Sequence, residues 1–169
     1  MKIVITGGCG FLGLGIARKL IKRQEARKAE GLTGKQQEIE SLVLFDAQVP
    51  DELPNGLDDR VSLAAGDISD RGQVTALIDR DDIAVFHLAS VVSAGGEQDF
   101  DLAIRVNFDG TFNVLEACRA RGIAVYPATG ANDTAVAEYV ITAALLLLRG
   151  AYGASRAVAE GAWPRNALM

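Results

Sequence analysis

The sequence has few of the residues that build metal sites, disulfide frameworks and histidine-dependent active sites. Among its 169 residues there are two cysteines, one histidine and four prolines. With only His87 available, a zinc site or a Ser-His-Asp triad is hard to assemble. Cys9 and Cys118 are far apart and lack metal-ligand spacing. They indicate two free thiols in a reducing cytoplasm.

Charge and hydropathy argue against two further classes of protein. The formal net charge is -5, so the basic stripe typical of nucleic-acid-binding proteins is missing. The N-terminus runs directly into a predicted strand, without a signal peptide. The one long apolar run, Thr134 to Leu148, is interrupted by Glu138 and is shorter than the roughly 20 residues of a membrane span. We therefore expect a cytoplasmic protein that binds neither nucleic acid nor membrane.

The pattern that is present is an alternation of strands and helices. Short, nearly continuous apolar runs are typical of parallel strands buried on both faces, and helical spacings separate them. The fold class is therefore α/β, a doubly wound parallel sheet of Rossmann type. The expected strands are residues 2–6, 41–46, 61–65, 83–88 and 123–128.

The expected helices lie between these strands. Leu12, Ile16 and Leu20 mark the first, and Asp70 can cap the second, which should run to about Arg80. A third, long helix ends at Gly122 and has one face marked by Phe108, Phe112 and Leu115. Residues 24–40 are predicted to be a helix end followed by a solvated loop.

A glycine-rich loop follows the first strand and opens the first helix. Thr6–Gly13 reads TGGCGFLG, which contains both the G-x-G-x-x-G and the G-x-x-G-x-x-G arrangement. Glycine lets the backbone approach a pyrophosphate, and the free amides at the helix start meet its charge. Asp46, ending the second strand, can accept hydrogen bonds from an adenosine ribose and repel a 2′-phosphate. The pair predicts NAD rather than NADP; the alternative is a tight turn with no ligand.

Four motifs in order over about residues 1–122 resemble the extended short-chain dehydrogenase/reductase family of NAD-dependent epimerases and dehydratases. They are the glycine loop, the GDI element at 66–68, the HLAS element at 87–90, and R-x-N-x-x-G-T at 105–111. Leu32–Gly34 and residues 91–101 resemble the D-erythronate dehydrogenase subfamily in particular. The cofactor-binding residues that the resemblance and the loop argument imply are Gly7, Gly10, Phe11, Leu12, Gly13, Asp46, Asp67, Ile68, Leu88, Ala89, Ser90 and Asn107.

Each motif also has a purely structural alternative. Asp67 can cap a turn, His87 can be a satisfied core histidine, and Asn107 can bond only to backbone.

The second half departs from that family's pattern. In the family a Ser/Thr element follows the fifth strand, and a helix then carries the catalytic Y-x-x-x-K. Here Thr129 and Tyr152-Gly-Ala-Ser-Arg156 stand at about those places. The resemblance implies Tyr152 as general base, Arg156 as its cation and Thr129 as the group that orients the substrate oxygen. Arginine favours tyrosinate but cannot copy the compact ammonium of lysine, so the alternative is an ordinary amphipathic helix.

Residues 119–169 resemble a different family, the D-2-hydroxyacid dehydrogenases, and its sulfolactate dehydrogenase-like members in particular. The likeness rests on residues 128–139 and on Gly161–Arg165. The catalytic Arg, Glu and His of that family lie further along and are absent here. We expect an NAD-binding Rossmann domain over 1–128 and a helical segment of different apparent origin over 129–169. The C-terminal substrate domain of the first family is then missing.

The helix predicted over Thr134–Arg149 is apolar on nearly every face, so it should be buried against another surface. That surface is either the open sheet or a second chain, and we expect a homodimer or poor solubility. Two functions remain open. One is NAD-dependent oxidation of a hydroxyl on a small sugar acid or nucleotide sugar; the other is a catalytically inactive, truncated or chimeric NAD-binding module.

Overall fold

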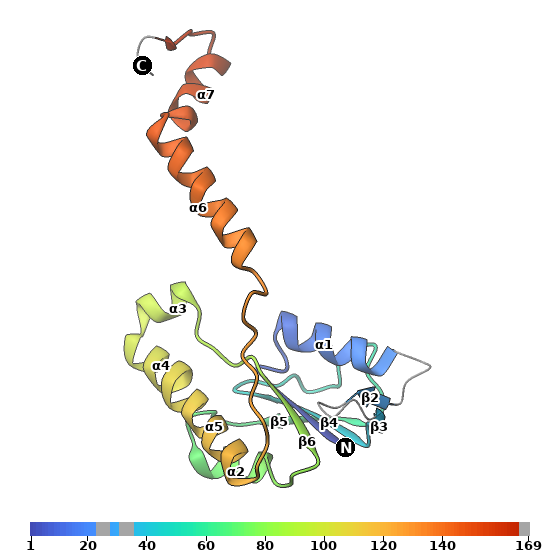
Figure 1. Cartoon of the computed structure of the whole chain (residues 1–169). Coiled ribbons are helices and arrows are strands. Elements are labelled where there is room, and N and C mark those ends of the chain that lie inside the picture. The colour runs from blue at the N-terminus through green and yellow to red at the C-terminus, as the bar shows by residue number, and fades with distance from the viewer. Residues whose placement is uncertain (23–27, 31–35, 166–169) are drawn as a thin grey trace. The chain divides into compact units, whose positions relative to one another are not determined.

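The structure, a computed structural model, describes residues 1–22, 28–30 and 36–165. It divides into two compact units, residues 1–125 and residues 126–169 (Figure 1). The first unit contains the strands and the helices that pack on them. The second is helical.

The core of the first unit is a four-stranded parallel sheet with the order β5-β4-β1-β6. The strands are β1 (Lys2–Thr6), β4 (Ser41–Asp46), β5 (Val61–Ala65) and β6 (Ile83–His87). β1 lies between β4 and β6, and its Ile3, Val4 and Ile5 are buried because helices cover both faces of the sheet. The first four predicted strands are confirmed, the fourth ending at His87 rather than one residue later.

Helices pack on both faces of this sheet, which confirms the doubly wound Rossmann arrangement. α1 (Phe11–Lys22) lies on one face, where Ala17 packs with Ile3, Ile5 and Leu44 (Figure 1). On the other face are α2 (Arg71–Leu77) and α5 (Thr111–Ala120), which cover Val4 and Phe45. Between β6 and α5 the chain forms α3 (Ser93–Gln98), α4 (Phe100–Ile104) and a π-helical stretch, η1 (Arg105–Gly110).

The predicted helix ends are borne out in part. The Asp70 carboxylate accepts from Gly72 N at 2.8 Å and Gln73 N at 3.0 Å, so it caps α2 as expected. That helix ends at Leu77, three residues before the predicted end. After α5, Gly122 adopts φ +66°, and Ile123 N donates to Cys118 O at 2.9 Å, which is a left-handed helix stop.

The face of α5 that meets the sheet is made of small and polar side chains. Asn113, Val114, Ala117 and Cys118 are buried, whereas Phe108, Phe112 and Leu115 are exposed. A Cβ at Gly110 would lie only 2.7 Å from Ile68 Cγ2, so helix and loop are in close contact there. The large apolar face noted in the sequence therefore points away from the core.

Two local predictions are wrong. Residues 123–128 form no strand; Val125 and Tyr126 are exposed, and Pro127 has no N–H to give to a ladder. An apolar run becomes a strand only when a neighbouring strand pairs with it and a helix covers it. Within the predicted loop 24–40, β2 (Lys28–Glu30) pairs antiparallel with β3 (Gln36–Glu38). Such a short polar ladder leaves no hydropathy signal. Leu32–Gly34 lies outside the described residues.

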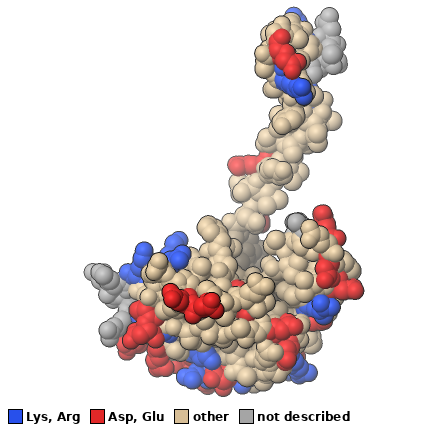
Figure 2. All heavy atoms as spheres, turned by 180° about the vertical axis from the view of Figure 1, so that it is seen from behind, with Lys and Arg blue, Asp and Glu red and all other residues tan. Residues whose placement is uncertain are grey.

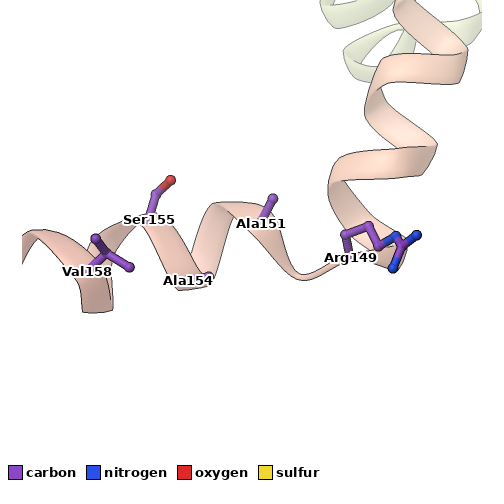
Figure 3. A pocket seen from close by; sticks show the side chains of 5 residues that line it. All are labelled: Arg149, Ala151, Ala154, Ser155 and Val158. Atoms are coloured by element: carbon purple, nitrogen blue, oxygen red, sulfur yellow. The ribbon is translucent and has the colours of Figure 1, made fainter. Parts of the chain in front are cut away.

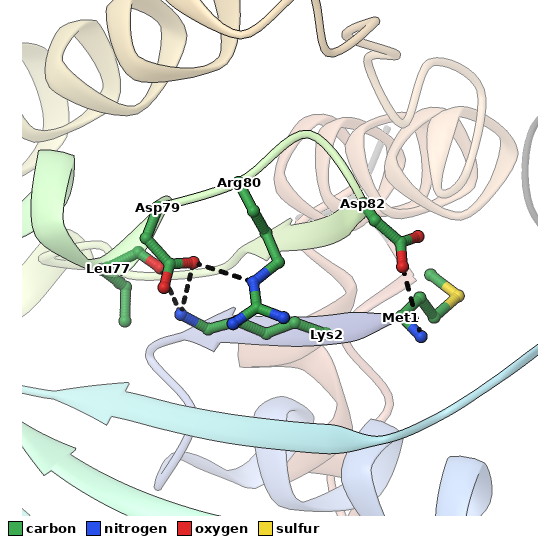
Figure 4. Close-up of polar contacts among 6 residues, drawn as sticks. All are labelled: Met1, Lys2, Leu77, Asp79, Arg80 and Asp82. Carbon is green, nitrogen blue, oxygen red and sulfur yellow. Dashed lines mark hydrogen bonds and ion pairs between the residues drawn. The ribbon is translucent and has the colours of Figure 1, made fainter.

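Polar side chains tie the amino end of β1 to its neighbours (Figure 4). Lys2 Nζ donates to Leu77 O at 2.7 Å and to Asp79 Oδ1 at 3.0 Å, and this hydrogen bond holds the pKa of Asp79 below its ordinary value. The Met1 ammonium lies 3.5 Å from carboxylate oxygens of Glu40 and Asp82. These contacts anchor one end of the sheet and leave the loops at the opposite, carboxyl end for the candidate site.

The second unit consists of α6 (Asp133–Leu148) and α7 (Ala151–Ala159), separated by Gly150 at φ +58°. The helix predicted over 134–149 is thus confirmed, but it has no buried residue. It carries only two charged side chains, and its surface is almost uncharged in Figure 2. No single described helix is long and apolar enough to cross a membrane; α6 and α7 meet that criterion only together, with a bend of 61° between them.

Candidate functional site

The four loops that follow β1, β4, β5 and β6 lie at one edge of the sheet. In a parallel sheet the carboxyl ends of all strands meet there, and ligands bind in the crevice outside them. The glycine loop, Asp46, the 66–69 loop and the 88–91 loop all belong to this edge.

The glycine loop is closely packed on its inner side. Gly7 has φ +66°, and a Cβ there would lie 2.9 Å from Ala89 N. A Cβ on Gly8 would lie 2.6 Å from Ile5 O, and one on Gly13 would lie 2.5 Å from Gly7 O. These three glycines let the loop sit directly against β1, the 88–90 loop and the start of α1.

The outer side of the loop is open backbone. At Gly10 the nearest atom to an added Cβ is Gly7 O, at 3.3 Å, and the residue is exposed. Phe11 and Leu12 begin α1 with side chains that are 92% and 63% exposed, so they do not close the loop. The first amides of a helix have no acceptor within it and carry the positive end of its dipole. A bare, electropositive backbone of this kind fits a pyrophosphate.

Asp46 turns toward this loop from the end of β4. Its Oδ2 accepts a hydrogen bond from Cys9 N at 3.0 Å. Burial and, to a lesser degree, the Asp46 carboxylate raise the pKa of the Cys9 thiol, which therefore stays protonated at neutral pH. The carboxylate and the open amides are side by side, as a dinucleotide needs for its ribose and its phosphates. The residues present fit that cofactor.

The 66–69 loop is held from three sides. Asp67 Oδ1 accepts from Ser69 N and from Ser69 Oγ, each at 2.8 Å, so Asp67 does cap a turn. Gln73 Oε1 accepts from Asp67 N at 2.9 Å. Asn113 Nδ2 donates to Ile68 O at 3.2 Å and to Ser69 O at 2.9 Å. These hydrogen bonds fix the backbone of the loop without any ligand, and Ile68 itself is buried.

The 88–91 loop is fixed by Asn107 and Thr6. Asn107 Oδ1 accepts from Val91 N at 2.8 Å and its Nδ2 donates to Val91 O at 2.9 Å, the backbone bonding expected as its structural alternative. Thr6 Oγ1 accepts from Leu88 N at 3.2 Å and Ala89 N at 3.3 Å. Leu88 and Ala89 are half-buried, and Ser90 is exposed at the edge of the sheet.

His87 ends β6, an outermost strand of the described sheet, and its ring lies between two threonines. Its Nδ1 is 2.7 Å from Thr6 Oγ1 and its Nε2 is 3.0 Å from Thr111 Oγ1. Burial lowers the pKa of the ring below its ordinary value. Both ring nitrogens therefore have a hydrogen-bond partner, as the structural alternative for His87 predicted.

The expected catalytic residues all belong to the second unit. Thr129 is exposed in a turn, and Tyr152, on α7, is 86% exposed. Arg156 Nε donates to Glu160 Oε1 at 3.2 Å, an i,i+4 pair on the same helix. A surface depression along α7 is lined by Arg149, Ala151, Ala154, Ser155 and Val158 (Figure 3). All five come from consecutive turns, and the Arg149 side chain points away from the other four (Figure 3).

Sequence analysis missed four residues that organise the first unit's site: Thr6, Gln73, Thr111 and Asn113. Their hydrogen-bond partners are known only once the chain has folded. Thr6 and Thr111 stand within the glycine-loop and R-x-N-x-x-G-T motifs, although no contact could be assigned to them. A polar Asn113 among the small apolar residues of α5 was a further signal, because a polar group on a buried helix face needs a partner.

Comparison with known proteins settles the family. Residues 4–136 match the 3-beta hydroxysteroid dehydrogenase/isomerase family. The chain belongs to this family. The resemblance to extended short-chain dehydrogenases is thereby confirmed.

Two curated relatives belong to the two enzyme types expected from the sequence. D-erythronate dehydrogenase of Cupriavidus necator is 39% identical over 175 residues, covering 95% of this chain and 48% of that protein. (S)-sulfolactate dehydrogenase of Chromohalobacter salexigens is 54% identical over 55 residues, covering 32% of this chain and 18% of that protein. The chain thus spans about half of the first relative and a smaller share of the second.

Solved structures agree with the fold. A nucleoside-diphosphate-sugar epimerase from Agrobacterium tumefaciens is 34% identical, with a TM-score of 0.57 over 71% of this chain and 32% of that one. UDP-glucose 4-epimerase of Thermus thermophilus, solved as a complex with NAD, is 25% identical, with a TM-score of 0.52 over 73% of this chain and 34% of that one. These relatives extend well beyond the part that matches, and the matching part has the Rossmann arrangement of strands and helices.

Proposed function

We propose that the first unit binds NAD(H) and that the chain is the cofactor-binding part of an oxidoreductase for a hydroxyl of a small sugar acid or nucleotide sugar. The observation that carries this proposal is the open glycine backbone with the Asp46 carboxylate hydrogen-bonded at its side. The family, the D-erythronate dehydrogenase relative and the NAD complex of a solved relative support it.

The chain's own residues divide the binding task. Gly7, Gly10 and Gly13, with the amides at Phe11 and Leu12, hold the pyrophosphate. Asp46 accepts from the adenosine ribose and repels a 2′-phosphate. The other residues proposed to border the cofactor are Asp67, Ile68, Leu88, Ala89, Ser90 and Asn107.

Oxidation of the substrate hydroxyl needs a general base that removes the hydroxyl proton. Bound NAD supplies the hydride acceptor. We assign the base to Tyr152, with Arg156 as the neighbouring cation and Thr129 as the donor that orients the substrate oxygen. One helical turn separates Tyr152 from Arg156, which is the spacing this role requires.

A second candidate is an NAD-binding module without turnover. The hydrogen bond that Arg156 donates to Glu160 favours it, because it engages the guanidinium on the same helix.

Calorimetric titration with NAD and with NADP tests the binding proposal. We expect NAD to bind at least about tenfold more tightly than NADP, and Asp46→Asn to remove most of that difference by abolishing the charge that repels the 2′-phosphate. Asp81→Asn, an exposed change before β6, serves as the control and should bind like the unaltered chain. Equal affinity for the two dinucleotides in the unaltered chain would disprove the Asp46 assignment.

A hydride-transfer assay on D-erythronate and related four-carbon sugar acids separates the two candidates. If Tyr152 is the base, Tyr152→Phe should lower the rate by about 10² or more, and Arg156→Lys should raise it. NAD binding without turnover on any of these substrates favours the module.

We further propose that the chain forms a homodimer through α6, because its apolar side chains are exposed on all sides. A cytoplasmic location stays a prediction that rests on the two free thiols.

A further inference from the structure

We propose that His87 is a positioning residue of the nucleotide site, which holds the glycine loop and the 88–90 loop at a fixed distance only as the neutral Nε2–H tautomer. Protonation of the ring then weakens dinucleotide binding. This inference rests on the proposed function, since it concerns the same site.

The hydrogen bonds at Thr6 determine which ring nitrogen of His87 carries the proton. Thr6 is fully buried, and its hydroxyl offers one proton and two lone pairs. Ala89 N donates to Thr6 Oγ1 at 3.3 Å. Leu88 N donates both to Thr6 Oγ1 at 3.2 Å and to Thr6 O at 3.1 Å, so the two amides occupy the lone pairs of Oγ1. The Thr6 proton must therefore point at His87 Nδ1, 2.7 Å away, which makes that nitrogen an acceptor. In the neutral ring the proton is then on Nε2.

The second ring nitrogen extends the same chain of bonds to α5. Nε2–H donates to Thr111 Oγ1 at 3.0 Å, where Thr111 is the first residue of that helix. The imidazole thus joins three elements: the end of β1, the end of β6 and the start of α5. Thr6 and His87 are also register partners in the β1–β6 ladder. The side-chain hydrogen bond therefore joins two residues that the sheet already places opposite one another.

This chain of bonds sets the separation of the two loops that would face the cofactor. Gly7 lies so close to the 88–90 loop that a Cβ on it would be 2.9 Å from both Ala89 N and Leu88 C. Thr6, the residue before Gly7, holds the same two residues through their amides. A change at Thr6 Oγ1 therefore acts on both loops at once.

Protonation removes the acceptor on which the arrangement depends. An imidazolium donates from both nitrogens. Thr6 Oγ1 would have to accept from His87 as well as from two amides. Leu88 N keeps its second acceptor, Thr6 O at 3.1 Å, so the amide that loses its partner is that of Ala89. The oxygen cannot serve three donors without the loop moving.

The ring is protected from protonation by burial, the only cause of its lowered pKa among the described residues. Titratable and charged groups stand on every neighbouring element: Lys2 on β1, Cys9 in the glycine loop, Asp46 on β4, Asp67 after β5, Arg105 and Asp109 in η1, and Glu116 and Arg119 on α5. Cys9 stays protonated, and Asp46 accepts from Cys9 N. A measurement between about pH 5.5 and pH 8 therefore isolates the ring from the titration of an ordinary carboxylate.

Nitrogen NMR of the ring tests the tautomer without any cofactor. His87 is the chain's only histidine, so ¹⁵N-histidine labelling of the full chain without a histidine tag reports one ring. The expected result at pH 8 is a single neutral tautomer with the proton on Nε2. The Nδ1–H tautomer, or an average of the two, overturns the proposal even if NAD binds tightly.

NAD titrations across the same pH range test the functional consequence. The affinity of the unaltered chain should fall by up to about tenfold per pH unit below the ring's pKa. His87→Gln offers an oxygen to Thr6 and an N–H to Thr111 but does not titrate. It should keep the neutral-pH affinity within a few-fold and lose the pH dependence. An identical pH profile in the two proteins overturns the proposal.

A pair of changes at Thr6 supplies the matched control. Thr6→Ser keeps the hydroxyl and should bind NAD like the unaltered chain, whereas Thr6→Val removes it and should lower the affinity at pH 8. Equal NAD affinity of the Val and Ser variants contradicts the role of the hydroxyl. If the unaltered chain binds no NAD at any pH, the proposed function fails, and the NMR tautomer still tests the His87 arrangement.

Discussion

The glycines at the end of the TGGCGFLG loop and just after it differ in what they do, because the space around each Cα differs. Gly13 and Gly15 are two residues apart in α1. A Cβ on Gly13 would lie 2.5 Å from Gly7 O and 2.7 Å from Gly8 Cα, which are backbone atoms that cannot rotate away. A Cβ on Gly15 would meet nothing within 4 Å. One position therefore needs glycine and the other does not.

We predict that Gly13→Ala lowers the free energy of unfolding by about 1–3 kcal/mol, as overpacking does, and weakens NAD binding more than tenfold by displacing the loop. Gly15→Ala should instead stabilise the chain by about 0.5–1 kcal/mol, because alanine favours a helix interior. Urea denaturation and NAD titration of the two variants check both statements. A Gly13→Ala chain as stable as its Gly15→Ala counterpart would contradict the packing argument.

The sequence indicated those single residues whose role follows from a neighbouring strand or helix. Asp46 could be singled out because it ends a strand, and Asp70 because it precedes a helix. The partners of Thr6 and Asn113 could not be predicted, because they are 82 to 83 and 44 to 45 residues away. A hydroxyl or an amide has no recognisable role until the fold brings its acceptor near.

Among the elements, α5 is hydrogen-bonded to the 66–69 loop through a buried side chain, beside the apolar contacts of Ile68 with the same helix. Asn113 Nδ2 donates to two backbone carbonyls of that loop, and the side chain is buried beside Val114 and Ala117. Two carbonyls that lose their donor in a buried place cost free energy.

We predict that Asn113→Ala lowers the free energy of unfolding by about 1–3 kcal/mol, since it leaves the Ile68 and Ser69 carbonyls without this donor. Asn55→Ala, the same change at an exposed position, should stay within about 0.5 kcal/mol of the unaltered chain. Equilibrium urea unfolding measures both. Equal midpoints for the two variants would show that Asn113 does not hold the loop.

The elements also show where pattern reasoning stops. The strands at 2–6, 41–46 and 61–65 were predicted to the residue, because a continuous apolar run with a turn behind it is a local signal. The run at 123–128 has the same signal and is not a strand, since pairing is a property of two segments. The β2–β3 ladder was not predicted for the opposite reason: five of its six residues are polar, and only their pairing makes them strands.

On the scale of the whole molecule, the chain combines a unit with a covered core and a unit without one. Residues 1–125 bury side chains on both faces of a sheet, whereas α6 and α7 bury none. We proposed that association through α6 covers its apolar side chains.

We predict that the full chain sediments as a dimer and that Ile141→Glu with Leu145→Glu, two exposed α6 positions one turn apart, converts it to a monomer with NAD affinity unchanged within about threefold. Burying a carboxylate in an apolar contact is strongly unfavourable. Val158→Glu, an exposed apolar position on α7, is the matched control and should leave the dimer intact. A dimer that survives the double change would place the interface elsewhere.

The order of apolar runs, the glycine loop and the carboxylate ending β4 were enough to predict a Rossmann unit and an NAD site, because hydrophobic periodicity and backbone freedom act over a few neighbouring residues. The folded chain alone revealed the bonds among Thr6, His87 and Thr111, the hold of Asn113 on the 66–69 loop, and the exposed face of α5. These depend on contacts between segments far apart along the chain, and such contacts exist only after the sheet has brought the segments together.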